Sequence, residues 1–383
     1  MIPYGKQDIN QADIDSVIDV LQSDFLTQGP QVPLFEKEIS NYCGAKFGVA
    51  VNSATSALHI ACLALELGKG DWLWTSPNTF VASANCGLYC GANVDFVDVD
   101  PLTYNMSVQE LEKKLIQAKR VNKLPKIVVP VHFAGQSCDM EKIHVLSKEY
   151  GFFVIEDASH AIGGKYLERP IGGCQFSDIT IFSFHPVKII TTAEGGLATT
   201  NSSTLAEKMQ LFRSHGIIRN QPSDGLWHYQ QVNLGFNYRM TELQAALGIS
   251  QVKRLDEFIA KRHILQKRYD ELLKDLPVTT PHQADFSYSA LHLYPIQIHT
   301  SSANEDRTQV FAKLRANNIG VNVHYIPVHT QPYYLEMGFE VGGFPVAESY
   351  YSQAISLPLF SQLSFDDQDK IISILKIALK RSH

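Results

Sequence analysis

Short apolar runs alternate with helix-like segments between about residues 46 and 200. The runs are rich in β-branched and aromatic residues and lack polar alternation, which is typical of strands covered on both faces. The predicted strands are residues 48–51, 94–99, 126–132, 152–157 and 178–184, and the predicted helices are residues 56–68, 107–119 and 139–150. A capping box, Ser107 with Glu110, opens the second helix. This alternation predicts an α/β fold with a mainly parallel, doubly wound sheet.

The pattern changes after a glycine- and polar-rich loop at residues 220–235. Thr241 and Gln244 form a capping pattern for a long helical stretch that reaches about Leu273. Beyond it, the predicted strands are residues 291–298 and 320–325, and the predicted helices are residues 304–316 and 365–379. We therefore expect a large domain over residues 13–250 and a smaller C-terminal α+β domain over residues 251–383.

Composition and charge argue against several classes of protein. The 383 residues include 33 Lys and Arg against 39 Asp and Glu, a net charge of −6, and no basic run is longer than a pair. Non-specific nucleic-acid binding would need a concentrated basic surface. Two long uncharged stretches, residues 47–65 and 72–94, are broken by polar clusters that a membrane would not tolerate. Because the start also lacks a signal-peptide pattern, we expect a cytoplasmic protein.

The six cysteines include no CxxC pair, so we interpret them as buried side chains of a protein in a reducing compartment. A zinc site could in principle use His132, Cys138 and His144. Their spacing matches no compact metal motif, and we therefore predict no metal.

Polar residues that directly follow predicted strands indicate the candidate site, because doubly wound sheets bind ligands at the carboxyl ends of their strands. Residues 52–57, Asn-Ser-Ala-Thr-Ser-Ala, offer hydroxyls and free N–H groups at a helix N-terminus. Such a turn suits a phosphate, although Ser and Thr are also ordinary N-caps. Asp157 closes a buried strand, where its carboxylate needs a partner that could also be a structural arginine.

Lys188 lies between apolar neighbours, Val187 and Ile189, after another buried strand. Such a lysine could have a depressed pKa and form a Schiff base, or it could extend along apolar surface to reach water. Phe80 could stack on a planar ring or fill the core. Together, a phosphate-binding turn, a carboxylate for a pyridinium nitrogen, a lysine for an aldehyde and an aromatic face are what pyridoxal phosphate requires.

Four segments around these residues resemble the DegT/StrS-type nucleotide-sugar aminotransferases. They are residues 155–161, 183–196, 212–216 and 235–242, and the resemblance extends over essentially the whole chain. These are fold type I pyridoxal phosphate enzymes, so the resemblance implies that architecture. Within the family, residues 2–5, 23–30 and 323–327 most resemble the UDP-4-amino-4,6-dideoxy-N-acetyl-β-L-altrosamine transaminases of pseudaminic acid synthesis.

The resemblance also implies roles for individual residues. Lys188 would form the Schiff base and shuttle the proton, and Asp157 would pair with the pyridinium nitrogen. The other cofactor contacts would be Ala54, Thr55 and Ser183 at the phosphate, Asn237 of the second subunit of a homodimer also at the phosphate, His160 near the ring hydroxyl and Phe80 on the ring. The substrate contacts would be Tyr4, Asp24, Phe25, Leu26, Thr27, Arg239, His324 and Tyr325, so that residues 1–12 contribute to the substrate cleft.

The implied reaction is a two-stage amino transfer. L-glutamate would convert the cofactor to pyridoxamine phosphate, which would deliver the amino group to C4 of UDP-2-acetamido-2,6-dideoxy-β-L-arabino-hex-4-ulose. A UDP-4-keto-pentose or a dTDP-4-keto-6-deoxyhexose would use the same catalytic set and stays open as substrate. A family dehydratase would lack the lysine, and a nicotinamide enzyme would need a GxGxxG motif, which is missing. A non-enzymatic sugar- or cofactor-sensing regulator would need a DNA-reading helix and a basic face, neither of which is visible.

Overall fold

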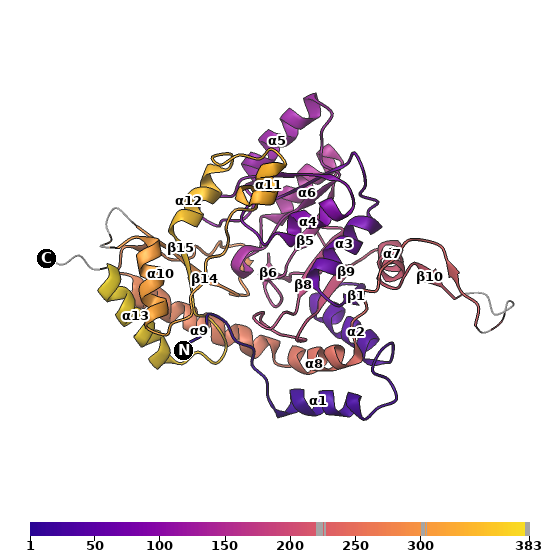
Figure 1. Cartoon of the computed structure of the whole chain (residues 1–383), viewed down its shortest axis with the longest axis horizontal. Coiled ribbons are helices and arrows are strands. Elements are labelled where there is room, and N and C mark those ends of the chain that lie inside the picture. Colours follow the sequence, from indigo (N-terminus) through magenta and orange to yellow (C-terminus); the bar gives the residue numbers. More distant parts are fainter. Residues whose placement is uncertain (220–224, 226, 300–302, 304, 380–383) are drawn as a thin grey trace.

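A seven-stranded sheet forms the centre of the computed structural model, which describes residues 1–219, 225, 227–299, 303 and 305–379 (Figure 1). In order across the sheet, the strands are β1 (Phe47–Val51), β9 (Gly196–Thr200), β8 (Ile179–Ser183), β5 (Phe153–Asp157), β4 (Ile127–Val129), β2 (Trp72–Thr75) and β3 (Asn93–Phe96). The pairs from β8 to β3 are parallel, whereas β9 is antiparallel to both of its neighbours. The predicted α/β class with a mainly parallel sheet is confirmed.

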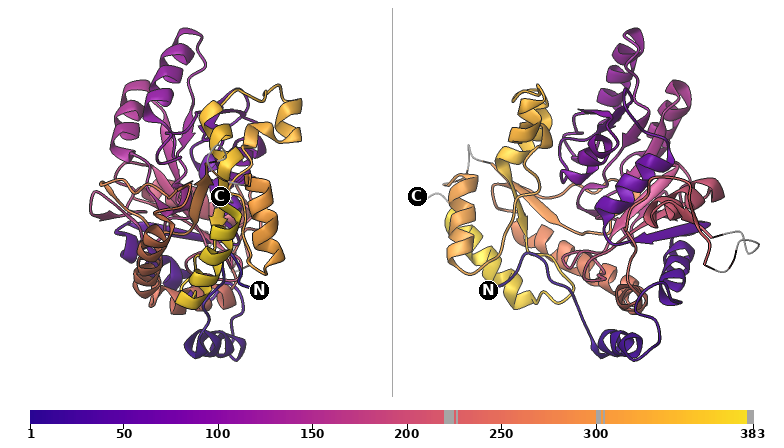
Figure 2. Two further views of the ribbon diagram at one scale, coloured as in Figure 1. Left: turned by 90° about the vertical axis from the view of Figure 1, so that its left-hand side faces the viewer. Right: turned by 45° about the vertical axis from the view of Figure 1, so that its right-hand side comes forward.

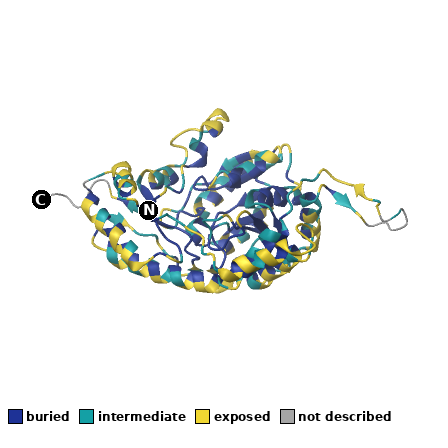
Figure 3. Cartoon of the chain, turned by 60° about the horizontal axis from the view of Figure 1, so that its bottom comes forward, coloured by how far each residue is buried: buried dark blue, intermediate teal, exposed yellow. Residues whose placement is uncertain are grey.

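Helices cover both faces of this sheet. The helices of this part of the chain are α1 (Gln11–Leu21), α2 (Gln31–Cys43), α3 (Ala54–Ala64), α4 (Ala82–Tyr89), α5 (Val108–Arg120), α6 (Met140–Tyr150), α7 (Ser203–Arg213), α8 (Glu242–Val252) and α9 (Leu255–Leu273); among them, α1 packs on α8. Alternate strand residues face opposite layers. Ile155 packs with α3, α4 and α7, whereas Val154 packs with α5 and α6, and Phe182 packs with α2, α8 and α9. Figure 3 shows the buried strands inside helices whose outer faces are exposed.

The C-terminal part has its own small sheet and core. Strands β12 (Val278–Thr279), β14 (Tyr294–Ile298) and β15 (Ala354–Leu357) pair antiparallel, and the helices here are α10 (Arg307–Ala316), α11 (Pro332–Glu336), α12 (Pro345–Gln353) and α13 (Phe365–Leu379). The second half of α9 joins this core through Leu265, Tyr269 and Leu273. The same helix packs Phe258 into the core of the large sheet. The division into domains at residue 250 stays a prediction.

Several short elements complete the described chain. They are β6 (Lys165–Tyr166), β7 (Arg169–Pro170), β13 (Ser287–Tyr288), β10 (Ile217–Ile218), β11 (Gln230–Gln231), and the 3-10 turns η1 (Phe133–Gly135) and η3 (Val328–Thr330). Strands β6, β7 and β13 form a small sheet over the connection from β5 to β8. The β10 segment projects from the body of the molecule (Figure 1).

The N-terminal segment links the two parts of the molecule. Ile2 belongs to the C-terminal core and bridges Ile319, and the chain then crosses to α1 beside α8 (Figure 2). Buried Asp13 fixes α1 there, because its carboxylate accepts hydrogen bonds from Arg254 at 2.6 Å and from Gln251 at 2.7 Å. Tyr4 lies between these two attachment points, in contact with the C-terminal part through the His324 ring.

Two predicted elements differ from the structure. The long helix after Thr241 is divided at Lys253 and Arg254, where Arg254 turns its guanidinium toward Asp8 and Asp13. Residues 320–325 do not form a regular strand: the segment makes one bridge, from Asn322 to Ser356, and the Tyr325 N–H then donates to the Asn78 side chain.

Parts of two other predicted elements lie outside the described residues. The predicted loop at residues 220–235 includes residues 220–224 and 226, and the predicted helix at residues 304–316 begins at residue 304, outside the described residues. In the described part of the chain, no helix has the length and apolar character needed to cross a membrane.

Candidate active site

A cavity of about 890 Å³ opens where β5 and β8 end and α3 begins. Of the predicted site residues, it brings together Tyr4, Ala54, Thr55, Phe80, Asp157, His160, Ser183, Lys188, His324 and Tyr325. These residues are separated by up to about 320 positions in the chain, and they come from the sheet, from the N-terminal segment and from the C-terminal part. The carboxyl ends of the parallel strands therefore form the site, as expected for a doubly wound sheet.

Asp157 ends β5 as a buried carboxylate with fixed orientation. Its Oδ2 accepts a hydrogen bond from Ser83 Oγ at 2.6 Å. Its Oδ1 accepts one from Ser159 Oγ at 2.6 Å and one from the Ser159 N–H at 3.2 Å. No arginine or lysine forms an ion pair with Asp157 among the described residues. The carboxylate is thus available to a cationic ligand group, and the structural-arginine alternative does not hold.

Lys188 lies in the loop after β8 and lines the same cavity. Burial lowers the pKa of its ammonium to about 8, although the nearby Asp157 carboxylate acts in the opposite direction. At neutral pH about one Lys188 side chain in ten is therefore a free amine, a far larger fraction than for an ordinary lysine. A free amine is the form that attacks an aldehyde.

The Lys188 pKa predicts the pH dependence of cofactor uptake. Because only the unprotonated amine reacts, the rate at which the cofactor-free protein captures pyridoxal phosphate should increase with pH and level off above a midpoint near 8. Stopped-flow absorbance measures this rate. A midpoint near 10, the value for an exposed lysine, would contradict the lowered pKa.

The first turn of α3 forms a cradle for an anion. Ser53 caps the helix by accepting from the Ser56 N–H at 3.1 Å, while the N–H groups of Ala54 and Thr55 have no acceptor among the described residues. These amides and the helix dipole favour a phosphate. Gly196 of β9 lies directly behind the turn: a Cβ there would come within 2.4 Å of the Ala54 nitrogen.

This contact makes Gly196→Ala a test of the cradle. The added methyl group must displace the first turn of α3, because real Cβ atoms do not approach backbone atoms so closely. We expect the dissociation constant for pyridoxal phosphate to increase by about tenfold, equivalent to about 1.4 kcal/mol. Equilibrium titration of the cofactor-free protein measures it. Gly68→Ala, where a Cβ meets nothing within 4 Å, is the matched control and should leave the constant unchanged.

A group of aromatic rings also lines the cavity. Tyr325 Oη lies 3.0 Å from His160 Nε2, and the His160 and His292 rings are 4.4 Å apart. Burial, together with the charge of Lys188, holds the pKa of His160 well below its ordinary value, so the ring is neutral. The buried His160 Nδ1 has no hydrogen-bond partner within the described chain. Phe80 is 60% exposed at the cavity rim.

Six of the predicted site residues lie away from this cavity. They are Asp24, Phe25, Leu26, Thr27, Asn237 and Arg239. Residues 24–27 are exposed beside the start of α8, where the Leu26 carbonyl accepts from the Glu242 N–H. Asn237 is exposed as well. The predicted roles of all six stay predictions, and they would require a contribution from outside this cavity.

The residues of the cavity that the sequence does not predict include Ser83, Ser159 and His292. Ser159 could have been found, because a serine two positions after an aspartate can donate its N–H to that carboxylate in an Asx turn. Ser83 and His292 carry no such local signal. The hypothetical zinc ligand His132 uses both ring nitrogens inside the protein, at Glu156 and at the Cys138 N–H.

The cavity fits pyridoxal phosphate on the chemistry of its donors. The α3 turn accepts a dianion, Asp157 accepts a protonated ring nitrogen, and Lys188 supplies an amine. The unpartnered His160 Nδ1 is a further polar atom that a ligand can satisfy. A buried polar atom left without a partner is costly, so a ligand group at this position stabilises the site.

Comparisons with known proteins agree with this fit. The model of the DegT/DnrJ/EryC1/StrS aminotransferase family matches residues 7–376. A transaminase of Campylobacter jejuni, UDP-4-amino-4,6-dideoxy-N-acetyl-beta-L-altrosamine transaminase, is 37% identical over 381 residues, 98% of each chain. Two solved structures each cover 99% of both chains. They are Helicobacter pylori PseC, an aminotransferase of pseudoaminic acid biosynthesis (33% identity, TM-score 0.90), and Streptococcus pneumoniae Spr1654, described as a sugar aminotransferase in its PMP form (29% identity, TM-score 0.91).

Proposed function

The chain belongs to the DegT/DnrJ/EryC1/StrS aminotransferase family, and from this premise we propose that it moves the amino group of L-glutamate to C4 of UDP-2-acetamido-2,6-dideoxy-β-L-arabino-hex-4-ulose in pseudaminic acid biosynthesis. That it is a pyridoxal phosphate-dependent nucleotide-sugar transaminase follows from the family. The sugar and the pathway are the proposed part. They are supported by the names of the Campylobacter and Helicobacter relatives.

The bound cofactor supplies an electron sink for the charge that develops when a proton leaves the neighbouring carbon. Asp157 keeps the ring nitrogen protonated in this proposal, because its carboxylate is buried and held by Ser83 and Ser159. The first turn of α3, with the hydroxyls of Thr55 and Ser183 in the same cavity, would hold the phosphate.

Lys188 has two tasks in the proposed mechanism. Its free amine would hold the cofactor between substrates, and the same side chain would accept and return the proton at the substrate carbon. A pKa of about 8 suits both tasks, since the amine and ammonium forms are both populated near neutral pH. The neutral, buried His160 adds no competing charge beside it.

The observation that carries the sugar-nucleotide proposal is the aromatic part of the cavity lining. Tyr4 reaches it from the N-terminal segment, and His324 and Tyr325 reach it from the C-terminal part. The rings of Tyr4 and His324 lie 5.6 Å apart. Aromatic faces and hydroxyl groups are suitable contacts for a sugar with an apolar 6-methyl group.

A panel of substrates tests this proposal. The enzyme should be incubated with L-glutamate and, separately, with 4-keto forms of UDP-linked 6-deoxyhexoses, UDP-pentoses and dTDP-linked 6-deoxyhexoses, and the aminated products should be measured by mass spectrometry. We expect the UDP-2-acetamido sugar to have the highest kcat/KM. A higher value for a UDP-pentose or a dTDP-sugar would overturn the assignment and favour that substrate.

A homodimer with a shared site is the second part of the proposal. Large apolar side chains, Trp227, Tyr229, Val232 and Leu234, are 52–82% exposed near Asn237 and beside the projecting β10 segment. Clustered exposed apolar residues of this kind mark interaction surfaces. A second copy would cover them and bring its Asn237 to the phosphate. Sedimentation should give a dimer, and Leu234→Asp should shift the protein toward monomer; a monomeric parent would contradict the proposal.

A further inference from the structure

Two adjacent carboxylates at the end of β5 point to opposite faces of the sheet. Asp157 lines the cavity, whereas Glu156 does not, as expected for consecutive residues of a strand. Glu156 is nevertheless buried, with 6% of its surface exposed. A buried carboxylate without partners would be very costly, so its surroundings have to satisfy it. The reaction described above makes no use of this group.

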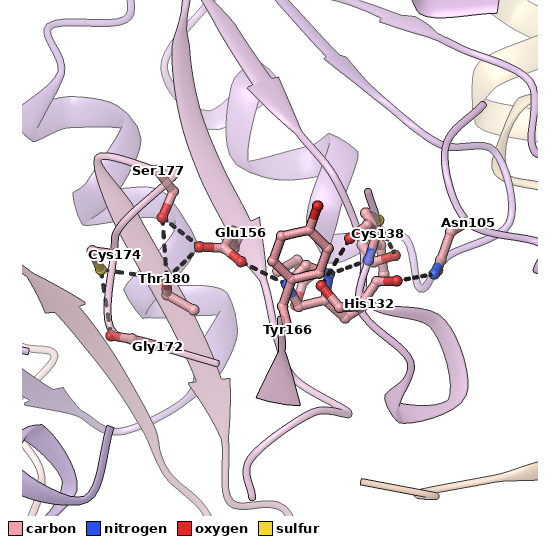
Figure 4. A network of polar contacts seen from close by, with 12 residues as sticks. Asn105, His132, Cys138, Glu156, Tyr166, Gly172, Cys174, Ser177 and Thr180 are labelled. Atoms are coloured by element: carbon pink, nitrogen blue, oxygen red, sulfur yellow. Dashed lines mark hydrogen bonds and ion pairs between the residues drawn. The ribbon is translucent and has the colours of Figure 1, made fainter. Parts of the chain in front are cut away.

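Glu156 is hydrogen-bonded to groups on both sides of its own strand (Figure 4). Its Oε2 lies 2.7 Å from Nε2 of His132, which follows β4. Its Oε1 accepts from Thr180 Oγ1 of β8 at 3.0 Å and from the hydroxyl of Ser177, just before β8. The side chain of Glu156 therefore ties the carboxyl end of β5 to the segment after β4 and to the start of β8.

His132 connects this network directly to Asp157. The His132 N–H donates to the Asp157 carbonyl at 3.0 Å, and the Asp157 N–H donates to the carbonyl of Pro130 at 2.9 Å. The Cys138 N–H donates to His132 Nδ1 at 3.2 Å, so that Nε2 is the nitrogen that carries the hydrogen toward Glu156. A displacement of His132 would thus also displace the backbone of Asp157.

Glu156 is charged in this environment. Burial raises the pKa of its carboxyl, but the hydrogen bonds from His132, Ser177 and Thr180 outweigh that effect and bring the pKa below its ordinary value. The other titratable neighbour, Cys174, stays neutral because burial raises the pKa of its thiol to about 11. Hydrogen bonds to an ionised acceptor are stronger than those between neutral groups.

We propose that Glu156 is a positioning residue for Asp157: its carboxylate locks the end of β5 between His132 and β8, so that the Asp157 carboxylate meets the ring nitrogen of the cofactor. The proposal rests on the proposed role of Asp157, and it is independent of the sugar. It assigns a function to a buried charged network that does not touch the cavity.

Glu156→Ala removes the acceptor of three buried donors. We expect the dissociation constant for pyridoxal phosphate to increase roughly ten- to hundredfold, the equivalent of losing hydrogen bonds to a charged group. The pH midpoint of the visible absorbance change of the bound cofactor should rise by about one unit. The reason for this direction is that a less firmly protonated ring withdraws less charge from the nitrogen that joins the cofactor to Lys188.

Two variants control for a simple loss of structure. In Glu156→Gln, the amide oxygen accepts from His132 and the amide nitrogen donates to a hydroxyl, so both readouts should stay close to the parent. Glu36 is another poorly exposed carboxylate, which accepts from Arg213 at 2.5 Å and from the Ala50 N–H at 2.9 Å. Glu36→Ala should lower the melting temperature and leave the absorbance midpoint unchanged.

The outcomes distinguish the role of Asp157 from the positioning role of Glu156. If Glu156→Ala lowers only the melting temperature, as Glu36→Ala does, the positioning role is overturned. If Asp157→Asn raises the absorbance midpoint while Glu156→Ala does not, the role of Asp157 stands and the positioning role of Glu156 fails. If Asp157→Asn leaves the midpoint unchanged, both fail. A parallel rise in both variants, with a parent-like Glu156→Gln, supports the proposal.

Discussion

Replacing Lys188 by alanine should lower kcat/KM for amino transfer by about four orders of magnitude or more while leaving the fold intact. The change removes the amine that we propose holds the cofactor and moves the proton, and base catalysis alone contributes up to about 10⁴-fold. The side chain forms no ion pair in the described structure, and its burial disfavours the charged form, so the melting temperature should not fall. Single-turnover kinetics and thermal melting measure the two effects.

Borohydride reduction provides the complementary observation for Lys188. Reduction of the loaded enzyme should fix the cofactor to one peptide, and peptide mapping should place it on Lys188. Lys208→Ala is a suitable control, because that lysine pairs with Glu66 at the surface and should be dispensable. A label on another lysine, or full activity in Lys188→Ala, would contradict the assignment.

The sequence predicts five of the seven strands of the central sheet, among them the largely buried β4, β5 and β8, but it does not predict β2 and β9. Continuous apolar runs such as residues 178–184 have one stable environment, a covered parallel sheet, and Asp157 and Lys188 follow directly from the ends of such runs. Residues 320–325, Gly-Val-Asn-Val-His-Tyr, contain two β-branched residues and a tyrosine but do not form a regular strand. There, the partner of Tyr325 is the side chain of Asn78, which lies some 250 positions away and leaves no local pattern.

The other features that the sequence does not predict depend on contacts between segments that are far apart in the chain. Ser83 is a serine in a small-residue helix, and only the fold places it 2.6 Å from Asp157. The sequence predicts only that Glu156 belongs to a strand, whereas its hydrogen-bond partners come from two other segments. Asn237 lies outside the cavity of its own chain, so its predicted role depends on a second copy. Periodicity determines layers, whereas hydrogen-bond partners across the sheet depend on tertiary packing.

Asp157→Asn should retain the shape of the site and lose its charge. The amide oxygen can still accept from Ser159, and the amide nitrogen can donate to the Ser83 hydroxyl, but the side chain no longer stabilises a proton on the ring nitrogen. We expect kcat/KM to fall by about 10²- to 10³-fold, the effect of removing one preorganised electrostatic contact. Steady-state kinetics at saturating cofactor measures this loss, which should lie mainly in kcat because the substrate contacts remain.

The same variant should also change the pH dependence of cofactor capture by Lys188. The Asp157 carboxylate raises the pKa of Lys188, in opposition to burial, so its removal should lower that pKa below about 8. The free amine then prevails at lower pH, and the midpoint for cofactor capture by the cofactor-free protein should move down. Asp178→Asn, at a carboxylate that accepts from the Val154 N–H outside the cavity, should leave this midpoint in place. An unchanged midpoint in Asp157→Asn would mean that the two groups do not interact, and the proposed pairing of carboxylate and lysine around the cofactor would fail.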